Sequence, residues 1–226
     1  MNSKTAILVF ANSAKEELQR KPIHGGEKLF DELTKKTLSI VKSTGLPFYI
    51  FTEKDQKGIT FGERFVHAIQ SVYDLGFENV IAIGNDTPYL KKQHILKSTQ
   101  QLENNKFVLG PSADGGFYLM GLHRSQFNAE TFLKLPWQSK DLAKSVTRFI
   151  KAAKIEVTHL QVLFDIDTID DLKMISKFCS KLSKKLNKII LDILQSTAKI
   201  WRFFNIRIDD LILLFYFNKG SPISIY

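Results

Sequence analysis

The chain has 226 residues, of which 44% are hydrophobic and 24% charged, so it fits one globular α/β domain with an appendage and excludes a disordered chain. Its one cysteine, Cys179, excludes an internal disulfide and favours a reducing, cytoplasmic setting. The net charge of +9 is uneven, because residues 1–170 hold 22 basic and 19 acidic residues whereas residues 171–226 hold 10 basic and 4 acidic ones. The basic excess thus belongs to the C-terminal tail, where it suits an anionic surface or a solvated helix face, and we expect no nucleic-acid partner.

Short apolar runs predict strands in the first half, and apolar residues at helical spacing predict helices between them. In chain order these elements are a strand at Thr5–Ala11, a helix at Phe30–Ser43, a strand at Pro47–Thr52, a helix at Gly62–Leu75 and a strand at Asn79–Gly84. Residues 12–30 carry mixed charge and a Gly-Gly turn, which predicts a loop with some helix. Thr87 and Pro88 are typical of a helix N-cap and first position, and predict a helix from there to about Leu102.

The same alternation continues in the second half. It predicts strands at Phe107–Pro111 and Gly116–Leu122, a helix at Leu142–Ala153 and a strand at Ile155–Gln161. Strands that alternate with helices favour a largely parallel, Rossmann-like sheet with helices on both faces.

The tail has a different pattern. Apolar residues recur at helical spacing from Thr168 to about Trp201, which predicts a long amphipathic helix, and we divide the chain into a domain at 1–178 and a basic extension at 179–226. The later apolar run Leu211–Phe217 is far shorter than the roughly 20 residues that cross a bilayer. We expect the tail to pack on the domain or form a homodimer, with peripheral contact at the inner membrane face as the alternative.

Three acidic segments are candidates for chemistry at strand ends, where open α/β sheets bind ligands. Asp86 follows an apolar run and is either a ligand of Mg²⁺ or part of a helix cap. Asp114 precedes Gly115 and Gly116, which predicts either a substrate-facing loop or a tight hairpin turn.

The third segment contains Asp165 and Asp167, which stand two residues apart on an extended stretch. Their side chains should therefore point to the same side. Asp167 is either a cap of the helix that follows or a second metal ligand that faces Asp86 across the end of the sheet.

Other candidates concern substrate binding. Trp137 either stacks on a base or anchors its loop to the core. Arg64 stands in the first turn of a helix, which either favours a phosphate or is an ordinary helix start with Glu63 in its first turn. Arg20, Lys21 and Lys28 follow the first strand, yet neither GxGxxG nor GxxxxGK[ST] occurs there. The histidines and the single cysteine form no zinc pattern, and there is no Gly-x-Ser-x-Gly nucleophile elbow.

Several segments in this order resemble one known set. They are Gly62-Glu63-Arg64, Ile83-Gly84-Asn85-Asp86-Thr87-Pro88-Tyr89-Leu90, Leu109-Gly110-Pro111-Ser112-Ala113-Asp114-Gly115-Gly116-Phe117-Tyr118-Leu119-Met120-Gly121-Leu122, Leu135-Pro136-Trp137-Gln138-Ser139 and Asp165-Ile166-Asp167-Thr168-Ile169-Asp170-Asp171-Leu172. The chain resembles, over about residues 5–175, a bacterial family of uncharacterised glycosyltransferase-A-like proteins, the nucleotide-diphospho-sugar transferases of the arsenosugar-biosynthesis type.

This resemblance implies a glycosyltransferase-A fold and a site for Mg²⁺ or Mn²⁺ held by Asp86 and Asp167, with Asp165 as the near alternative. It also implies that Asp114, Gly115 and Gly116 face the sugar or acceptor.

The chain departs from the family pattern after its first strand. Relatives usually carry Phe-Ala-Lys-x-Pro-x-x-Gly-x-x-Lys-Thr-Arg, which should hold nucleotide phosphates, where this chain reads Phe10-Ala11-Asn12-Ser13-Ala14-Lys15-Glu16-Glu17-Leu18. Arg20, Lys21 and Lys28 are the candidates to replace that loop.

Three functions follow as expectations. The first is a metal-dependent transferase that uses a nucleotide-diphospho-sugar, with Asp114 placed to orient or deprotonate the acceptor hydroxyl. The second is a nucleotidyltransferase that acts on a phosphorylated small molecule. The third is a catalytically impaired binding module that docks through its tail.

Overall fold

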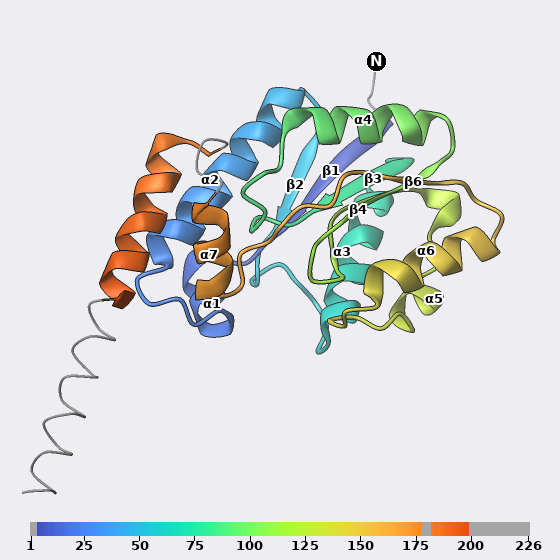
Figure 1. Cartoon of the computed structure of the whole chain (residues 1–226). Helices are drawn as coiled ribbons and strands as arrows, with labels where there is room; N and C mark the ends of the chain where they lie inside the picture. Colours follow the sequence, from blue (N-terminus) through green and yellow to red (C-terminus); the bar gives the residue numbers. More distant parts are fainter. Residues whose placement is uncertain (1–3, 178–181, 199–226) are drawn as a thin grey trace, which may run out of the picture.

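The computed structural model describes residues 4–177 and 182–198, which form an α/β fold around one six-stranded sheet (Figure 1). The strands are β1 (Thr5–Phe10), β2 (Phe48–Phe51), β3 (Asn79–Ile83), β4 (Phe107–Pro111), β5 (Phe117–His123) and β6 (Val157–His159). The helices are α1 (Ala14–Arg20), α2 (Glu27–Thr44), α3 (Phe61–Asp74), α4 (Lys92–Glu103), the short α5 (Ala129–Leu133), α6 (Leu142–Ala152) and α7 (Ile169–Ser176), together with a helix over residues 184–198.

The strand order is β2-β1-β3-β5-β4-β6, and only β5 runs antiparallel to its neighbours. The reason lies in the connections: β4 and β5 are joined by a tight hairpin turn, whereas the parallel pairs are joined by crossovers that contain helices. The predicted largely parallel sheet is confirmed, and the carboxyl ends of β1 and β3 lie at the same edge.

Successive residues of β1 supply the two faces of the sheet. Ala6 and Leu8 pack in a buried cluster with α3 and α6, whereas Ile7 and Val9 pack with residues of α2 and α4. Figure 1 shows the same arrangement, with α3, α5 and α6 on one side of the sheet and α2 and α4 on the other. Because both faces are covered, the strands β1, β3 and β4 are mostly apolar, and the polar groups of the site come from the loops at the strand ends.

Two predicted elements begin or end elsewhere in the structure. The helix predicted from Thr87 starts only at Lys92, because the Thr87 hydroxyl donates a hydrogen bond to Asp165 and residues 87–90 form a turn. The last strand is limited to Val157–His159 rather than Ile155–Gln161.

The amphipathic pattern of the tail corresponds to two helices rather than one. The first is α7, and the second covers residues 184–198, where the Ser183 hydroxyl accepts a hydrogen bond from the Leu186 amide as an N-cap does. Leu186, Ile190 and Ile193 are buried with residues of α1, α2 and α7. The second helix thus packs on the domain. The division of the chain at residue 178 stays a prediction. The apolar run Leu211–Phe217 lies outside the described residues.

This packing gives a first prediction. Ile190→Ala should lower the free energy of unfolding by about 2 kcal/mol or more, because Ile190 is only 1% exposed and its loss leaves a cavity. Leu191→Ala is the matched control, because Leu191 is 45% exposed and should change stability by less than about 0.5 kcal/mol. Denaturant titrations of both variants measure the difference, and equal effects would contradict the packing of this helix.

Candidate functional site

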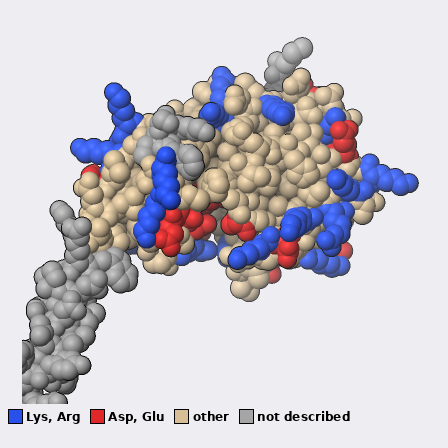
Figure 2. All heavy atoms as spheres, viewed as in Figure 1, with Lys and Arg blue, Asp and Glu red and all other residues tan. Residues whose placement is uncertain are grey.

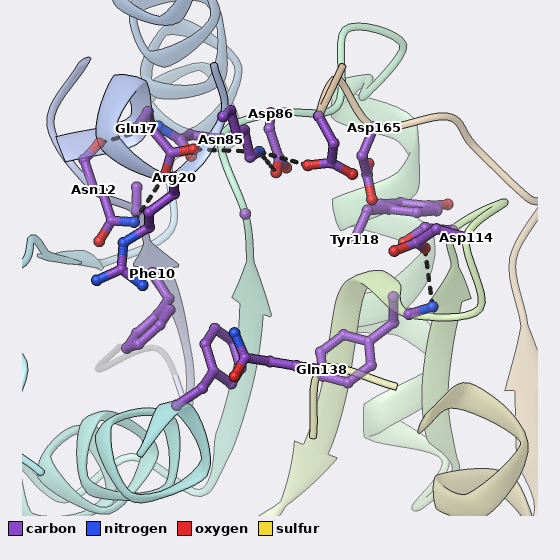
Figure 3. Close-up of a pocket in the computed structure, with 18 of the residues that line it drawn as sticks. Phe10, Asn12, Glu17, Arg20, Asn85, Asp86, Asp114, Tyr118, Gln138 and Asp165 are labelled. Carbon is purple, nitrogen blue, oxygen red and sulfur yellow. Dashed lines mark hydrogen bonds and ion pairs between the residues drawn. The ribbon is translucent and has the colours of Figure 1, made fainter. Parts of the chain in front are cut away.

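A cleft of about 680 Å³ opens at the carboxyl ends of β1 and β3 and beside the β4–β5 turn. Figure 3 shows Asp86, Asp165 and Asp114 along one side of it and Phe10 and Gln138 across from them. This is the edge of the sheet at which α/β proteins bind ligands.

Asp86 lies in the loop that follows β3. The preceding residue, Asn85, is buried and fixes this loop, because its amide nitrogen donates to the Thr34 hydroxyl at 2.8 Å and to the Asn12 carbonyl at 3.4 Å. The Asp86 carbonyl accepts a hydrogen bond from the Ile166 amide at 3.1 Å, which ties this loop to the segment that contains Asp165 and Asp167. These bonds hold the Asp86 side chain at the cleft without using its carboxylate.

Lys21 directly follows α1, and its ammonium group contacts three carboxylates of the site. The ammonium nitrogen lies 2.5 Å from Asp86 Oδ2, 2.9 Å from Asp167 Oδ1 and 3.2 Å from Glu17 Oε2. Burial alone would lower the pKa of Lys21, but the charges of Asp86, Glu17 and Asp167 outweigh burial and hold its pKa above the ordinary value. We call these four residues the Lys21 cluster, and its lysine stays charged at neutral pH.

Asp165 and Asp167 both line the cleft, as side chains two residues apart on an extended segment should, and Asp86 lines it as well. Asp165 accepts the Thr87 hydroxyl, and burial together with the charge of Asp86 raises its pKa to about 7. Burial also raises the pKa of Asp167, against the opposing effect of Lys21. Burial is thus the main cause of both shifts, and the charge of Asp86 adds to it.

The helix cap predicted as an alternative for Asp167 is provided by other residues. Thr168 is the N-cap of α7, and its hydroxyl accepts the Asp171 amide while Asp171 accepts the Thr168 amide. The Asp167 carboxylate is thereby left to Lys21 and the cleft.

The cluster can be compared with the needs of a divalent cation. Mg²⁺ usually takes one or two protein carboxylates and completes its shell with water and substrate phosphates. Among residues 4–177 and 182–198, no group of three or more His, Cys, Asp or Glu side chains is arranged to hold a metal ion. Asp86 and Asp167, however, both direct an oxygen at one cation, the Lys21 ammonium, so this pair fits a divalent ion once the lysine moves away.

Asp114, Gly115 and Gly116 form the turn between β4 and β5. Asp114 Oδ1 accepts the Gly116 amide at 2.9 Å, and Gly115 has a φ of +97°. A β-carbon at Gly115 would lie 2.0 Å from the Lys140 carbonyl oxygen, so glycine is required there by the backbone. The segment is therefore a tight turn that also faces the cleft, because Asp114 and Gly116 line it.

Trp137 and Arg64 lie outside the cleft lining. Trp137 packs against Phe61, Phe65 and Phe117, and its ring nitrogen donates to the Phe132 carbonyl at 2.8 Å. The Trp137 ring covers Gly62, because a β-carbon at Gly62 would lie 2.4 Å from a ring carbon. Lys28 is exposed and does not line the cleft. Arg64 donates to the Ile59 carbonyl at 2.7 Å, and the substrate role expected of both residues stays a prediction.

Sequence reasoning missed other residues of the site. Glu17 is only 5% exposed although it lies in a segment predicted mainly as a loop. Its position four residues before Lys21 is the signal that could have identified it.

Phe10 and Phe61, which were also missed, form an aromatic wall opposite the acids, with rings 5.6 Å apart at an angle of 77°. This wall suits the stacking of a base or the apolar face of a sugar.

The charge of the cleft is mostly negative. Five acidic side chains line it against three basic ones: Glu17, Asp86, Asp114, Asp165 and Asp167 against Arg20, Lys21 and Lys140. Figure 2 shows acidic side chains gathered on both sides of a hollow beside α7. An anionic ligand thus requires added positive charge in this cleft.

One model of a known family matches part of the chain. Residues 48–139 match the family described as "Uncharacterized protein conserved in bacteria (DUF2064)". The match includes Asp86 and Asp114 but neither the loop after β1 nor Asp165 and Asp167. No curated protein matches the sequence.

Solved structures support the fold over most of the chain. A "putative nucleotide-diphospho-sugar transferase" from Desulfovibrio desulfuricans G20 has a TM-score of 0.76 and 22% identity, covering 86% of this chain and 98% of that one. The 4-diphosphocytidyl-2C-methyl-D-erythritol synthase from Anaerococcus prevotii DSM 20548 has a TM-score of 0.53 and 14% identity, covering 79% and 100%. Rv0371c from Mycobacterium tuberculosis H37Rv has a TM-score of 0.52 and 13% identity, covering 77% and 98%.

The chain therefore has the fold shared by nucleotide-diphospho-sugar transferases and nucleotidyltransferases, as the sequence predicts. Within the described residues, no helix is long and apolar enough to span a membrane.

Proposed function

We propose that the chain is a transferase that binds a nucleotide-diphospho-sugar together with Mg²⁺ or Mn²⁺ and transfers the sugar to an acceptor hydroxyl. The observation that carries this proposal is the meeting of carboxylates from three separate loops at one end of a cleft whose opposite wall is aromatic. The structural relative with the TM-score of 0.76 bears the name of that class.

In this proposal Asp86 and Asp167 hold the divalent cation, with Asp165 beside them. A cation held by these carboxylates would supply the charge stabilisation that a diphosphate leaving group needs. The need for a cation follows from the cleft itself, because its acidic excess would repel a free diphosphate.

The other residues divide between the donor and the acceptor. Phe10 and Phe61 contact the base or the sugar, and Lys21 is the basic residue that contacts Asp86 and Asp167. Asp114 orients the acceptor hydroxyl or takes its proton, because its carboxylate is fixed at the rim by the Gly116 amide. Gly116 leaves room for the ligand beside that carboxylate.

Calorimetric titration with UDP- and GDP-sugars, with and without Mn²⁺, tests the proposal. We expect binding of at least one donor that depends on the cation and is lost with EDTA. Failure of the folded protein to bind any donor in the presence of Mn²⁺ would overturn it.

A nucleotidyltransferase is the second candidate, favoured by the fold similarity to the cytidylyl-transferring synthase. The acidic lining counts against it, because a nucleoside triphosphate brings more negative charge than a diphospho-sugar. Release of pyrophosphate from a nucleoside triphosphate and a phosphorylated acceptor would distinguish this reaction from sugar transfer.

The third expectation, a binding module that docks through the tail, concerns mainly residues outside the described part of the chain. Cation-dependent donor binding without turnover in any acceptor screen would favour it over both transferases. Sedimentation with anionic liposomes and gel filtration, with and without residues 199–226, would separate membrane contact from dimerisation.

A further inference from the structure

Lys21 is an unusual lysine because its side chain is only 13% exposed and its ammonium contacts three carboxylates. Lysine normally keeps its charged group in water and is rarely buried unless paired. The position of this ammonium, between Asp86 and Asp167, is the one that a divalent cation would take between the same two oxygens.

The ammonium and a divalent ion cannot share that position. Both are positive, and at contact distance in a partly buried site they repel each other strongly. Binding of a cation to Asp86 and Asp167 therefore requires the Lys21 ammonium to move.

The charge of the Lys21 cluster favours exchange of the ammonium for a divalent cation. Lys21 brings one positive charge to Glu17, Asp86 and Asp167, and the charges of Asp86 and Asp114 act on the neighbouring Asp165 as well. A divalent ion would neutralise more of this charge than the ammonium does. Lys21 itself lines the open cleft, so its long side chain has space to swing toward a ligand.

We propose that Lys21 is an exchangeable counter-ion of the acidic site: it pairs with Asp86 and Asp167 when no divalent cation is bound, and Mg²⁺ or Mn²⁺ displaces it into the cleft. This inference rests on the proposed function only in taking Asp86 and Asp167 as the cation ligands. The displaced ammonium is then available to the phosphate oxygens of a donor, so that one event creates both the metal site and a basic group beside it.

Chemical labelling of the wild-type protein tests the displacement of Lys21. An amine-acylating reagent followed by peptide mass spectrometry measures the reactivity of Lys21 with and without Mn²⁺, and with Mg²⁺ in parallel. We expect Lys21 to be protected without the cation and labelled about tenfold faster with it, because an ion-paired, buried ammonium is shielded. Lys28, an exposed lysine of α2, is the internal control and should react equally in both conditions. A Lys21 reactivity that Mn²⁺ leaves unchanged would overturn the displacement.

Mn²⁺ affinity of variants tests the competition. Lys21→Met should bind Mn²⁺ about tenfold more tightly than the wild type, because the competing ammonium no longer lowers the fraction of free site. Adding Asp86→Asn to Lys21→Met should remove the gain, and Lys28→Met should behave like the wild type. Calorimetry or electron paramagnetic resonance gives the affinities, and circular dichroism checks that each variant is folded.

A folded Lys21→Met that binds Mn²⁺ no more tightly than the wild type, or a pair of proteins that both fail to bind, would contradict the proposal. These measurements contain no nucleotide. If Mn²⁺ displaces Lys21 but no donor binds, the exchange is supported and the transferase proposal is overturned. If donor binding depends on Mn²⁺ while Lys21 stays protected, the transferase proposal is supported and the exchange is overturned.

Discussion

Asp86→Asn should weaken Mn²⁺-dependent binding of a nucleotide-diphospho-sugar by about 100-fold, because Asp86 is only partly buried and its removal should cost about 2–3 kcal/mol, the low end of the range for buried charged partners. The substitution keeps the shape of the side chain and removes the charge that faces the Lys21 ammonium at 2.5 Å. The fold should remain, because Lys21 keeps Glu17 and Asp167 as partners and the Asp86 backbone keeps its bond to Ile166. Calorimetric titrations with and without Mn²⁺ measure the loss.

Asp170→Asn is the matched control for this variant. It removes the same charge from a nearby carboxylate that is 80% exposed and pairs with Lys173 on the surface of α7. Surface ion pairs of this kind contribute at most about 1 kcal/mol, so donor binding should equal that of the wild type. Equal weakening by the two substitutions would indicate a general charge effect and contradict a specific role of Asp86.

The sequence predicted the elements of the sheet because each depends on local patterns. The apolar runs that become β1, β3 and β4 are buried on both faces, and such strands are visible as short continuous runs. Side chains two residues apart on an extended segment face the same way, and Asp165 and Asp167 accordingly both line the cleft.

The sequence could not predict features that depend on distant partners. Thr87 and Pro88 have the local pattern of a helix start, but the Thr87 hydroxyl bonds to Asp165, 78 residues later, and the helix begins further on. The position of Lys21 depends on α1, which a mixed-charge segment with no clear apolar period did not specify. Its partners Asp86 and Asp167 lie 65 and 146 residues further along the chain, so only the folded chain shows the cluster.

Gly115→Ala should lower the free energy of unfolding by about 4 kcal/mol, which combines backbone strain at positive φ with overpacking. Gly115 has a φ of +97°, and a β-carbon there would lie 2.0 Å from the Lys140 carbonyl oxygen and 2.6 Å from its carbon. These atoms belong to the backbone, so the turn and the segment before α6 would have to separate. The hydrogen bond from the Ala143 amide to the Gly115 carbonyl, at 3.0 Å, would be weakened by the same movement.

Gly76→Ala separates the two causes. Gly76 has a φ of +94° but no atom within 4 Å of its added β-carbon, so the substitution carries the backbone strain alone, about 1–2 kcal/mol. The difference between the variants in denaturant unfolding then measures the contact with Lys140, and no difference would contradict it. Because Asp114 and Gly116 on one side and Gln138, Ser139 and Lys140 on the other line the cleft, forcing these segments apart should also weaken donor binding in Gly115→Ala but not in Gly76→Ala. Such a result would assign Gly115 to the shape of the site rather than to contact with the sugar.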